Sequence, residues 1–192
     1  MLKIDRKFIY KVLKAWIPLA ATITLLCGVI YLIMQQTYRM DANDPQVQIT
    51  GDVKAALEDG ATPDQMVGQS KADIAKTLDP FIIIYDINKQ IVVTSASLNG
   101  SSPSIPGGVL DQVAKKDEER VTWQPQKDVR IAAVVVKYKD GFVLAGRSLK
   151  EVESRIQKHG INVLIGWVFT LAGTLFTVIV VHLVYNKLKK TI

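Results

Sequence analysis

Few side chains in this sequence are of the types that perform acid–base or nucleophilic chemistry. The only histidines are His159 and His182, and both lie at or inside the C-terminal apolar segment. Cys27 is the only cysteine, so we expect neither a disulfide within the chain nor a cysteine metal cluster. A Ser-His-Asp arrangement would have to recruit His159 from the membrane-proximal edge of the central region. The sequence therefore predicts no catalytic residue, no metal site and no cofactor. We expect that the protein is not an enzyme, and a hydrolase is the weakest of the alternatives.

Four residues are unusual within otherwise apolar predicted strands and are the candidates for ligand binding: Tyr85, Trp123, Arg130 and Arg147. A planar guanidinium suits carboxylate or phosphate ligands. The alternative is structural. In that case the two arginines reach solvent at strand ends and pair with Asp86 or Asp128, as surface residues commonly do. Tyr85 and Trp123 would then pack in the core.

Two long apolar segments indicate that the chain crosses a membrane twice. Residues 15–34 carry no charged side chain, and residues 161–185 carry none either, apart from the titratable His182. Twenty helical residues span about 30 Å, the thickness of the hydrocarbon core of a bilayer. The net charge of +6 comes from basic residues in segments 1–14 and 186–192. This distribution follows the positive-inside rule and places both termini in the cytoplasm. The region between the spans is close to neutral, which argues against nucleic acid as a partner.

Small residues recur along both apolar segments and predict close packing of helices in the membrane. The first stripe consists of Ala20, Thr24 and Gly28, and the second of Gly166, Thr170, Gly173, Thr174 and Thr177. The simplest interpretation is an antiparallel pair formed by the two spans. Homodimerisation through the same faces is the alternative.

The region between the spans has the pattern of an α+β domain with a five-stranded antiparallel sheet and flanking helices. Asp44-Pro45 predicts the start of a helix that Gly60 ends, and the capping box at Thr62 predicts a second helix as far as Asp79. Further along, the expected elements are a hairpin of strands 81–87 and 90–95, a loop 97–108, a helix 109–116, strands 121–124, 129–138 and 142–147, and a helix capped by Ser148.

The pattern of Phe81–Asp86, Ile91–Ser95 and Gly141–Leu149 resembles the extracytoplasmic PAS-like sensor domains, of the Cache type, in bacterial two-span membrane sensors. The resemblance implies a PAS-like fold and a role in sensing or ligand binding. Only residues 186–192 follow the second span, so we expect no kinase or chemoreceptor output domain and a separate partner for any signal. Leu149, Val152 and Ile156 form a short apolar seam, which predicts a signalling helix that packs on the sheet or on a second copy.

These observations combine into one prediction. Its segments are a cytoplasmic basic N-terminus (1–14), a transmembrane helix (15–34), an extracytoplasmic PAS-like domain (35–160), a second transmembrane helix (161–185) and a cytoplasmic basic tail (186–192). We expect a multi-pass protein of the bacterial inner membrane that acts as a sensory or ligand-binding module and modulates a separate partner. Its expected partners are the lipid bilayer, a protein or a second copy, and a small-molecule ligand. The alternative is an accessory subunit of a membrane complex that binds no small molecule.

Overall fold

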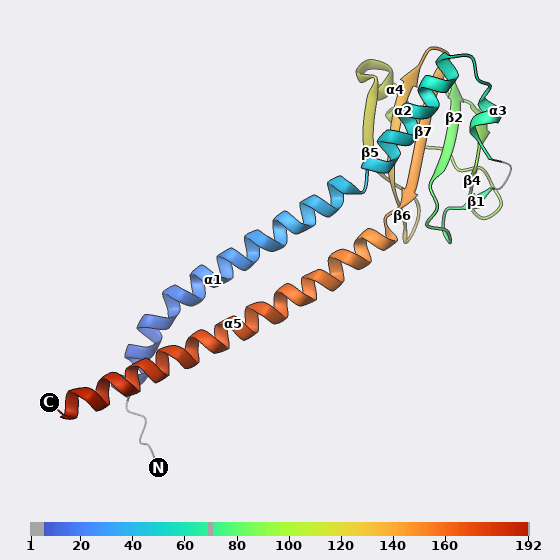
Figure 1. The fold of residues 1–192 in the computed structure, drawn as a ribbon. Coiled ribbons are helices and arrows are strands. Elements are labelled where there is room, and N and C mark those ends of the chain that lie inside the picture. Colours follow the sequence, from blue (N-terminus) through green and yellow to red (C-terminus); the bar gives the residue numbers. More distant parts are fainter. Residues whose placement is uncertain (1–5, 69–70, 192) are drawn as a thin grey trace. The chain divides into compact units, whose positions relative to one another are not determined.

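The computed structural model describes residues 6–68 and 71–191 of the chain (Figure 1). It divides into two compact units. One is the α+β domain, Thr37–Ser154, and the other is a helix pair formed by Met1–Gln36 and Arg155–Ile192.

A five-stranded antiparallel sheet forms the centre of the α+β domain, as the sequence predicts. Its spatial order is β3-β2-β7-β6-β5. The strands are β2 (Phe81–Asp86), β3 (Ile91–Thr94), β5 (Glu118–Gln126), β6 (Val129–Tyr138) and β7 (Gly141–Ser148). The predicted hairpins are confirmed, with Lys89 in the turn of the first at a φ of 65°. β7 has the central place because it pairs with β2 on one side and with β6 on the other.

The central strands are buried on both faces of the sheet, which explains their nearly continuous apolar sequences. On one face, α2 (Asp44–Glu58) covers β6 and β7, and its Val53 packs with Val134 and Val143 (Figure 1). On the other face, α4 (Gly107–Lys116) lies against β5 and β6, and its Leu110 and Val113 are fully buried. The domain therefore has a helix, sheet, helix arrangement with a separate apolar core on each face.

The ends of α2 agree with the sequence at one terminus and differ at the other. Gly60 ends the helix with a φ of 100°, and its N–H bonds to the carbonyl of Leu57 while that of Ala61 bonds to the carbonyl of Ala56. This is a Schellman motif, for which glycine is suited because it lacks a Cβ. At the other end the cap is Asn43, one residue before the predicted Asp44, so the proline lies in the second helical position.

The prediction of a long second helix from Thr62 to Asp79 is wrong. The capping box forms, with the Thr62 N–H donating to Gln65 Oε1 at 2.9 Å, but α3 spans only Pro63–Met66 and Val67 is already extended. Residues 69–70 lie outside the described part. β1 (Ala72–Asp73) then pairs in parallel with β4 (Ala96–Ser97), so pairing with a distant segment overrides the local helical pattern.

β5 begins earlier than the predicted residue 121, because Glu118 and Glu119 already belong to the strand. The cause lies at the end of α4, where Asp117 adopts a left-handed conformation with a φ of 65°. Its carbonyl then accepts a bond from the Lys137 N–H at 2.9 Å, which brings the chain directly alongside β6.

Two long helices contain the predicted membrane spans. They are α1 (Arg6–Asp41) and α5 (Lys150–Thr191), and both are long and apolar enough to cross a membrane. Their apolar windows are not buried by the rest of the protein. α5 follows β7 after the single residue Leu149, so Leu149 and not the predicted Ser148 directly precedes the helix. The Lys150 N–H donates to the hydroxyl oxygen of Ser148 at 3.3 Å.

Candidate functional site

The junction between β7 and α5 is fixed to the sheet by both candidate arginines. Leu149 is buried, and its N–H donates to the carbonyl of Arg130 at 2.8 Å. The Arg130 guanidinium pairs with Glu153. That of Arg147 lies 3.4 Å from the carboxylate of Glu151, and its Nε donates to the Leu78 carbonyl at 2.9 Å. The first turn of α5 is therefore held by two adjacent strands.

These ion pairs position the helix more than they stabilise the fold. The side chains of Arg130 and Glu153 are 45% and 43% exposed, and pairs at this exposure contribute roughly 0.2–1 kcal/mol. The partners are glutamates of α5, whereas the sequence suggested Asp86 or Asp128. Of the apolar seam, Leu149 is buried while Val152 and Ile156 are partly buried.

Tyr85 and Trp123 lie on the opposite face of the sheet, in the core that α4 covers. Tyr85 is fully buried, and its hydroxyl accepts a hydrogen bond from the Ile105 N–H at 3.1 Å. Burial raises the pKa of this phenol above its ordinary value. Trp123 is 6% exposed and its ring packs edge-on against that of Phe81, with centroids 6.4 Å apart.

The four candidate residues therefore do not form one site. Side chains alternate along a strand, so Arg130 shares a face of β6 with Val134, which packs under α2. Arg147 pairs with Ala132 on that same face. The two arginines hold α5 from one face of the sheet, and the two aromatic residues fill the core of the other.

The helix pair is linked by hydrogen bonds from two tryptophans. Trp16 Nε1 lies 3.3 Å from both the Leu171 carbonyl and Thr174 Oγ1, and Trp167 Nε1 donates to Thr24 Oγ1 at 3.0 Å. The rings of Phe8 and His182 meet edge-on, 6.5 Å apart. Position numbers rise along α1 as they fall along α5, so the helices are antiparallel, in agreement with the prediction from the sequence.

The contact face of α5 is not the predicted stripe of small residues. Gly166, Thr170, Gly173 and Thr177 are all exposed. The face toward α1 consists mostly of larger residues at spacings of three and four, among them Val163, Trp167 and Leu171, and Thr174 is the member of the predicted stripe that lies on it. The three threonines of the stripe donate to carbonyls of their own helix, as Thr170 does to Gly166 at 2.7 Å. The prediction is better on α1, where Ala20 is partly buried, Thr24 bonds to Trp167 and Gly28 lines a groove.

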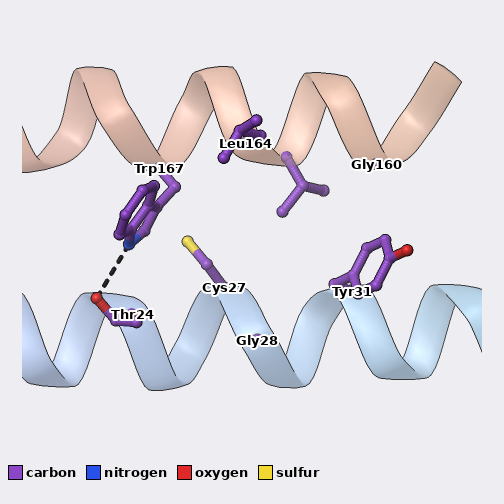
Figure 2. A pocket seen from close by; sticks show the side chains of 8 residues that line it. Thr24, Cys27, Gly28, Tyr31, Gly160, Leu164 and Trp167 are labelled. Carbon is purple, nitrogen blue, oxygen red and sulfur yellow. Dashed lines mark hydrogen bonds between the residues drawn. The ribbon is translucent and has the colours of Figure 1, made fainter. Parts of the chain in front are cut away.

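This groove lies between the two helices and has a volume of about 300 Å³ (Figure 2). Thr24, Cys27, Gly28 and Tyr31 of α1 line one side. Gly160, Val163, Leu164 and Trp167 of α5 line the other. It opens to the side of the helix pair and its wall is almost entirely apolar. Such a groove suits an apolar ligand.

The sequence analysis found Thr24 and Gly28 of this groove but missed the other residues that line it, because it followed small residues only. The signal was present in α1, where the partly or fully buried positions recur every three or four residues: Phe8, Val12, Trp16, Ala20, Ile23, Cys27 and Tyr31. That spacing is typical of a helix seam, and a search for larger residues at it would have found Trp16, Cys27 and Tyr31.

The residues described by the structure include no group of three or more histidine, cysteine, aspartate or glutamate side chains that could hold a metal ion. Comparisons with protein-family models, with curated proteins and with solved structures found no match to this chain.

Proposed function

We propose that this protein is a two-span membrane protein whose α+β domain is an extracytoplasmic PAS-like module that modulates a separate protein partner. The observation that carries the proposal is the junction at Leu149. There the central strand of the sheet leads directly into α5, and Arg130 and Arg147 tie the first turn of that helix to two strands. A change in the sheet would reach the beginning of the membrane helix through these contacts.

The apolar surface of the helix pair supports the location in a membrane. Leu25 is 71% exposed, Leu32 63% and Phe169 74%. Exposure of such apolar side chains to water is unfavourable, whereas the hydrocarbon core of a bilayer accommodates them. The basic residues that flank both apolar segments support cytoplasmic termini, and hence an α+β domain on the outside, by the positive-inside rule. For a bacterial protein, this is the inner membrane.

The sheet topology supports the PAS-like assignment. Among the five strands of the sheet, the first in sequence, β2, and the last, β7, lie side by side in the centre. The remaining strands are added outward by hairpins, with β3 at one edge and β5 at the other. This arrangement is the one that we expect of a PAS-like sheet with helices on its faces.

The input to the module is either a small molecule or a contact with another protein. The packing around Tyr85 favours the second, because side chains of the α4 face and the Ile105 backbone surround this residue completely. The alternative function is therefore an accessory subunit of a membrane complex, in which the domain binds no small molecule and serves as a surface.

Hydrogen exchange on the full chain in lipid nanodiscs tests the transmission step. The comparison is between wild type, Arg130→Gln and the control Arg120→Gln, whose guanidinium pairs with Glu118 within β5 and does not reach α5. Loss of the Arg130 pair should speed amide exchange in residues 150–154 several-fold and leave β2 unchanged, whereas the control should change neither region. Equal exchange in all three proteins would contradict the proposal.

Thermal-shift screening of the same samples against carboxylates, amines and sugars distinguishes the two inputs. A compound that raises the melting temperature and also slows exchange at residues 150–154 supports sensing. If every compound leaves the melting temperature unchanged, sensing of these classes is excluded and the accessory role remains.

A further inference from the structure

The groove in the helix pair is a short slot that is bounded at both ends. At one end the hydrogen bond from Trp167 to Thr24 joins the two helices. At the other, the ring of Tyr31 lies against Gly160, where an added Cβ would be 3.1 Å from Tyr31 Cε2. Cys27 and Leu164 lie between these ends (Figure 2). At 1.5 Å of rise per residue, the slot extends along about 10 Å of α1.

The hydroxyl groups and the indole N–H of the wall already have partners in the helix pair. Thr24 Oγ1 accepts from the indole of Trp167 and lies 2.8 Å from the Ala20 carbonyl. The hydroxyl of Tyr31 accepts from Gln35 Nε2 at 3.2 Å. A ligand that required hydrogen bonds would leave its own polar groups unsatisfied in this slot, which is costly in an apolar environment. The wall therefore suits hydrocarbon.

Gly28 keeps part of the slot open. A Cβ at this position would have no heavy atom within 4 Å. Side chains that border an unfilled space lose dispersion contacts on that side. A flexible apolar chain that entered from the open side would restore these contacts.

The closed ends decide between the apolar occupants. A helix that packs along the pair needs a continuous face over several turns, and the slot is limited to about 10 Å by Trp167 and Tyr31. It also lies within or beside the charge-free segments of both helices, where acyl chains would surround it. We propose that the slot binds the end of a phospholipid acyl chain. This inference rests on the proposed insertion of the helix pair in a bilayer.

Retention of lipid by the purified full chain tests this site. The probe is a vesicle of phosphatidylcholine and phosphatidylglycerol from which the protein is extracted in mild detergent, and native mass spectrometry then counts bound phospholipid. Gly28→Leu should fill the slot and lower retention at least about tenfold, with Gly28→Ala intermediate. Gly166→Leu is the matched control, because Gly166 also has nothing within 4 Å and is exposed on α5 away from the slot. It should retain lipid as wild type does.

A second readout uses the native cysteine. In vesicles, Gly28→Leu should change the rate at which a membrane-permeant maleimide labels Cys27, while Gly166→Leu should not. Equal lipid retention by wild type and Gly28→Leu, with unchanged helix content, would overturn the proposal. Efficient formation of a Cys27 disulfide between two chains on oxidation would do so too, because a second copy would then occupy the slot. Flotation with the vesicles separates the two levels: protein that floats but retains no lipid contradicts the slot alone, whereas protein that does not float contradicts membrane insertion.

Discussion

Tyr85 shows how a polar residue can be built into an apolar core. Its ring is fully buried, and its hydroxyl satisfies the backbone N–H of Ile105 in the loop before α4. A buried donor that loses its partner costs about 1–3 kcal/mol. The residue therefore holds the loop over this face of the sheet, in addition to filling space.

The first prediction concerns the replacement Tyr85→Phe. At neutral pH it should lower the free energy of unfolding by about 1–3 kcal/mol, because the Ile105 N–H is left without its acceptor. Denaturation of the full chain in detergent, followed by fluorescence of Trp123 in a Trp16→Phe, Trp167→Phe background, measures this. A change below the error of the method would show that the hydrogen bond does not contribute.

The same variant should alter the dependence of stability on pH. Burial raises the pKa of Tyr85 in the folded state, so the phenol is neutral in both states at lower pH. Above the ordinary value of 10.0, the unfolded chain ionises first and wild type loses stability as pH rises. Tyr85→Phe lacks this contribution. The difference in the free energy of unfolding between wild type and Tyr85→Phe should therefore shrink above pH 10. Tyr138, whose pKa is also raised by burial, remains in both. If the difference in the free energy of unfolding stays constant above pH 10, ionisation of Tyr85 is not the cause.

Among the elements, β7 has the least freedom to change. It is central in the sheet, and at Gly141 a Cβ would lie 2.0 Å from the backbone oxygen of Tyr85. Gly146 is similarly close to the ring of Phe81, at 2.4 Å. Strand β7 thus needs glycine at both positions to approach β2, and a register shift would break its pairing with β6 on the other side.

We predict that Gly141→Ala destabilises the α+β domain by about 3 kcal/mol or more, since a clash with backbone cannot be relieved by a side-chain rotation. Gly108→Ala is the control, because that position in α4 has no heavy atom within 4 Å of an added Cβ. It should be neutral or stabilising by up to about 1 kcal/mol, as alanine loses less entropy in a helix. The denaturation measurement described for Tyr85→Phe applies, and equal stabilities for the two variants would contradict the steric argument.

The sequence predicts an element correctly where a local pattern sets its secondary structure. It fails where pairing with a segment far away in the sequence sets the secondary structure. β6 and β7 follow from apolar runs on either side of Asp140-Gly141, and α2 from its proline and terminal glycine. The segment after Met66 has a helical sequence pattern. Its backbone instead forms a parallel strand pair, in which Ala72 pairs with Ala96, and no local pattern predicts this pairing. The sequence identifies the two candidate arginines by the chemistry of the guanidinium group. Their roles follow only from the structure, which places their partners Glu151 and Glu153 in the first turn of α5.

At the scale of the whole molecule, α1 precedes the α+β domain in the chain and α5 follows it. The antiparallel course of these helices brings the basic first turns of α1, from Arg6 on, and the basic last turns of α5 to the same end of the pair, as the contact of Phe8 with His182 shows. Both charged ends can therefore lie on one side of a bilayer, as the positive-inside rule requires.

This arrangement predicts different access to two introduced cysteines in a Cys27→Ser background. Ala114→Cys lies at an exposed position of α4 in the α+β domain, and Leu188→Cys lies near the end of α5, where Leu188 is 60% exposed. A membrane-impermeant maleimide added to intact cells should label the first cysteine and not the second, because the positive-inside rule predicts that the basic ends lie in the cytoplasm. Permeabilisation should make both cysteines reactive.

The other outcomes of this labelling are equally informative. Labelling of Leu188→Cys alone in intact cells would invert the topology and place the α+β domain in the cytoplasm, where the junction at Leu149 would act on the opposite side of the membrane. Labelling of both cysteines before permeabilisation would show that the chain crosses the membrane once or not at all. Two apolar helices in antiparallel contact are compatible with the predicted outcome because each satisfies its own backbone hydrogen bonds, which any segment within a bilayer must do.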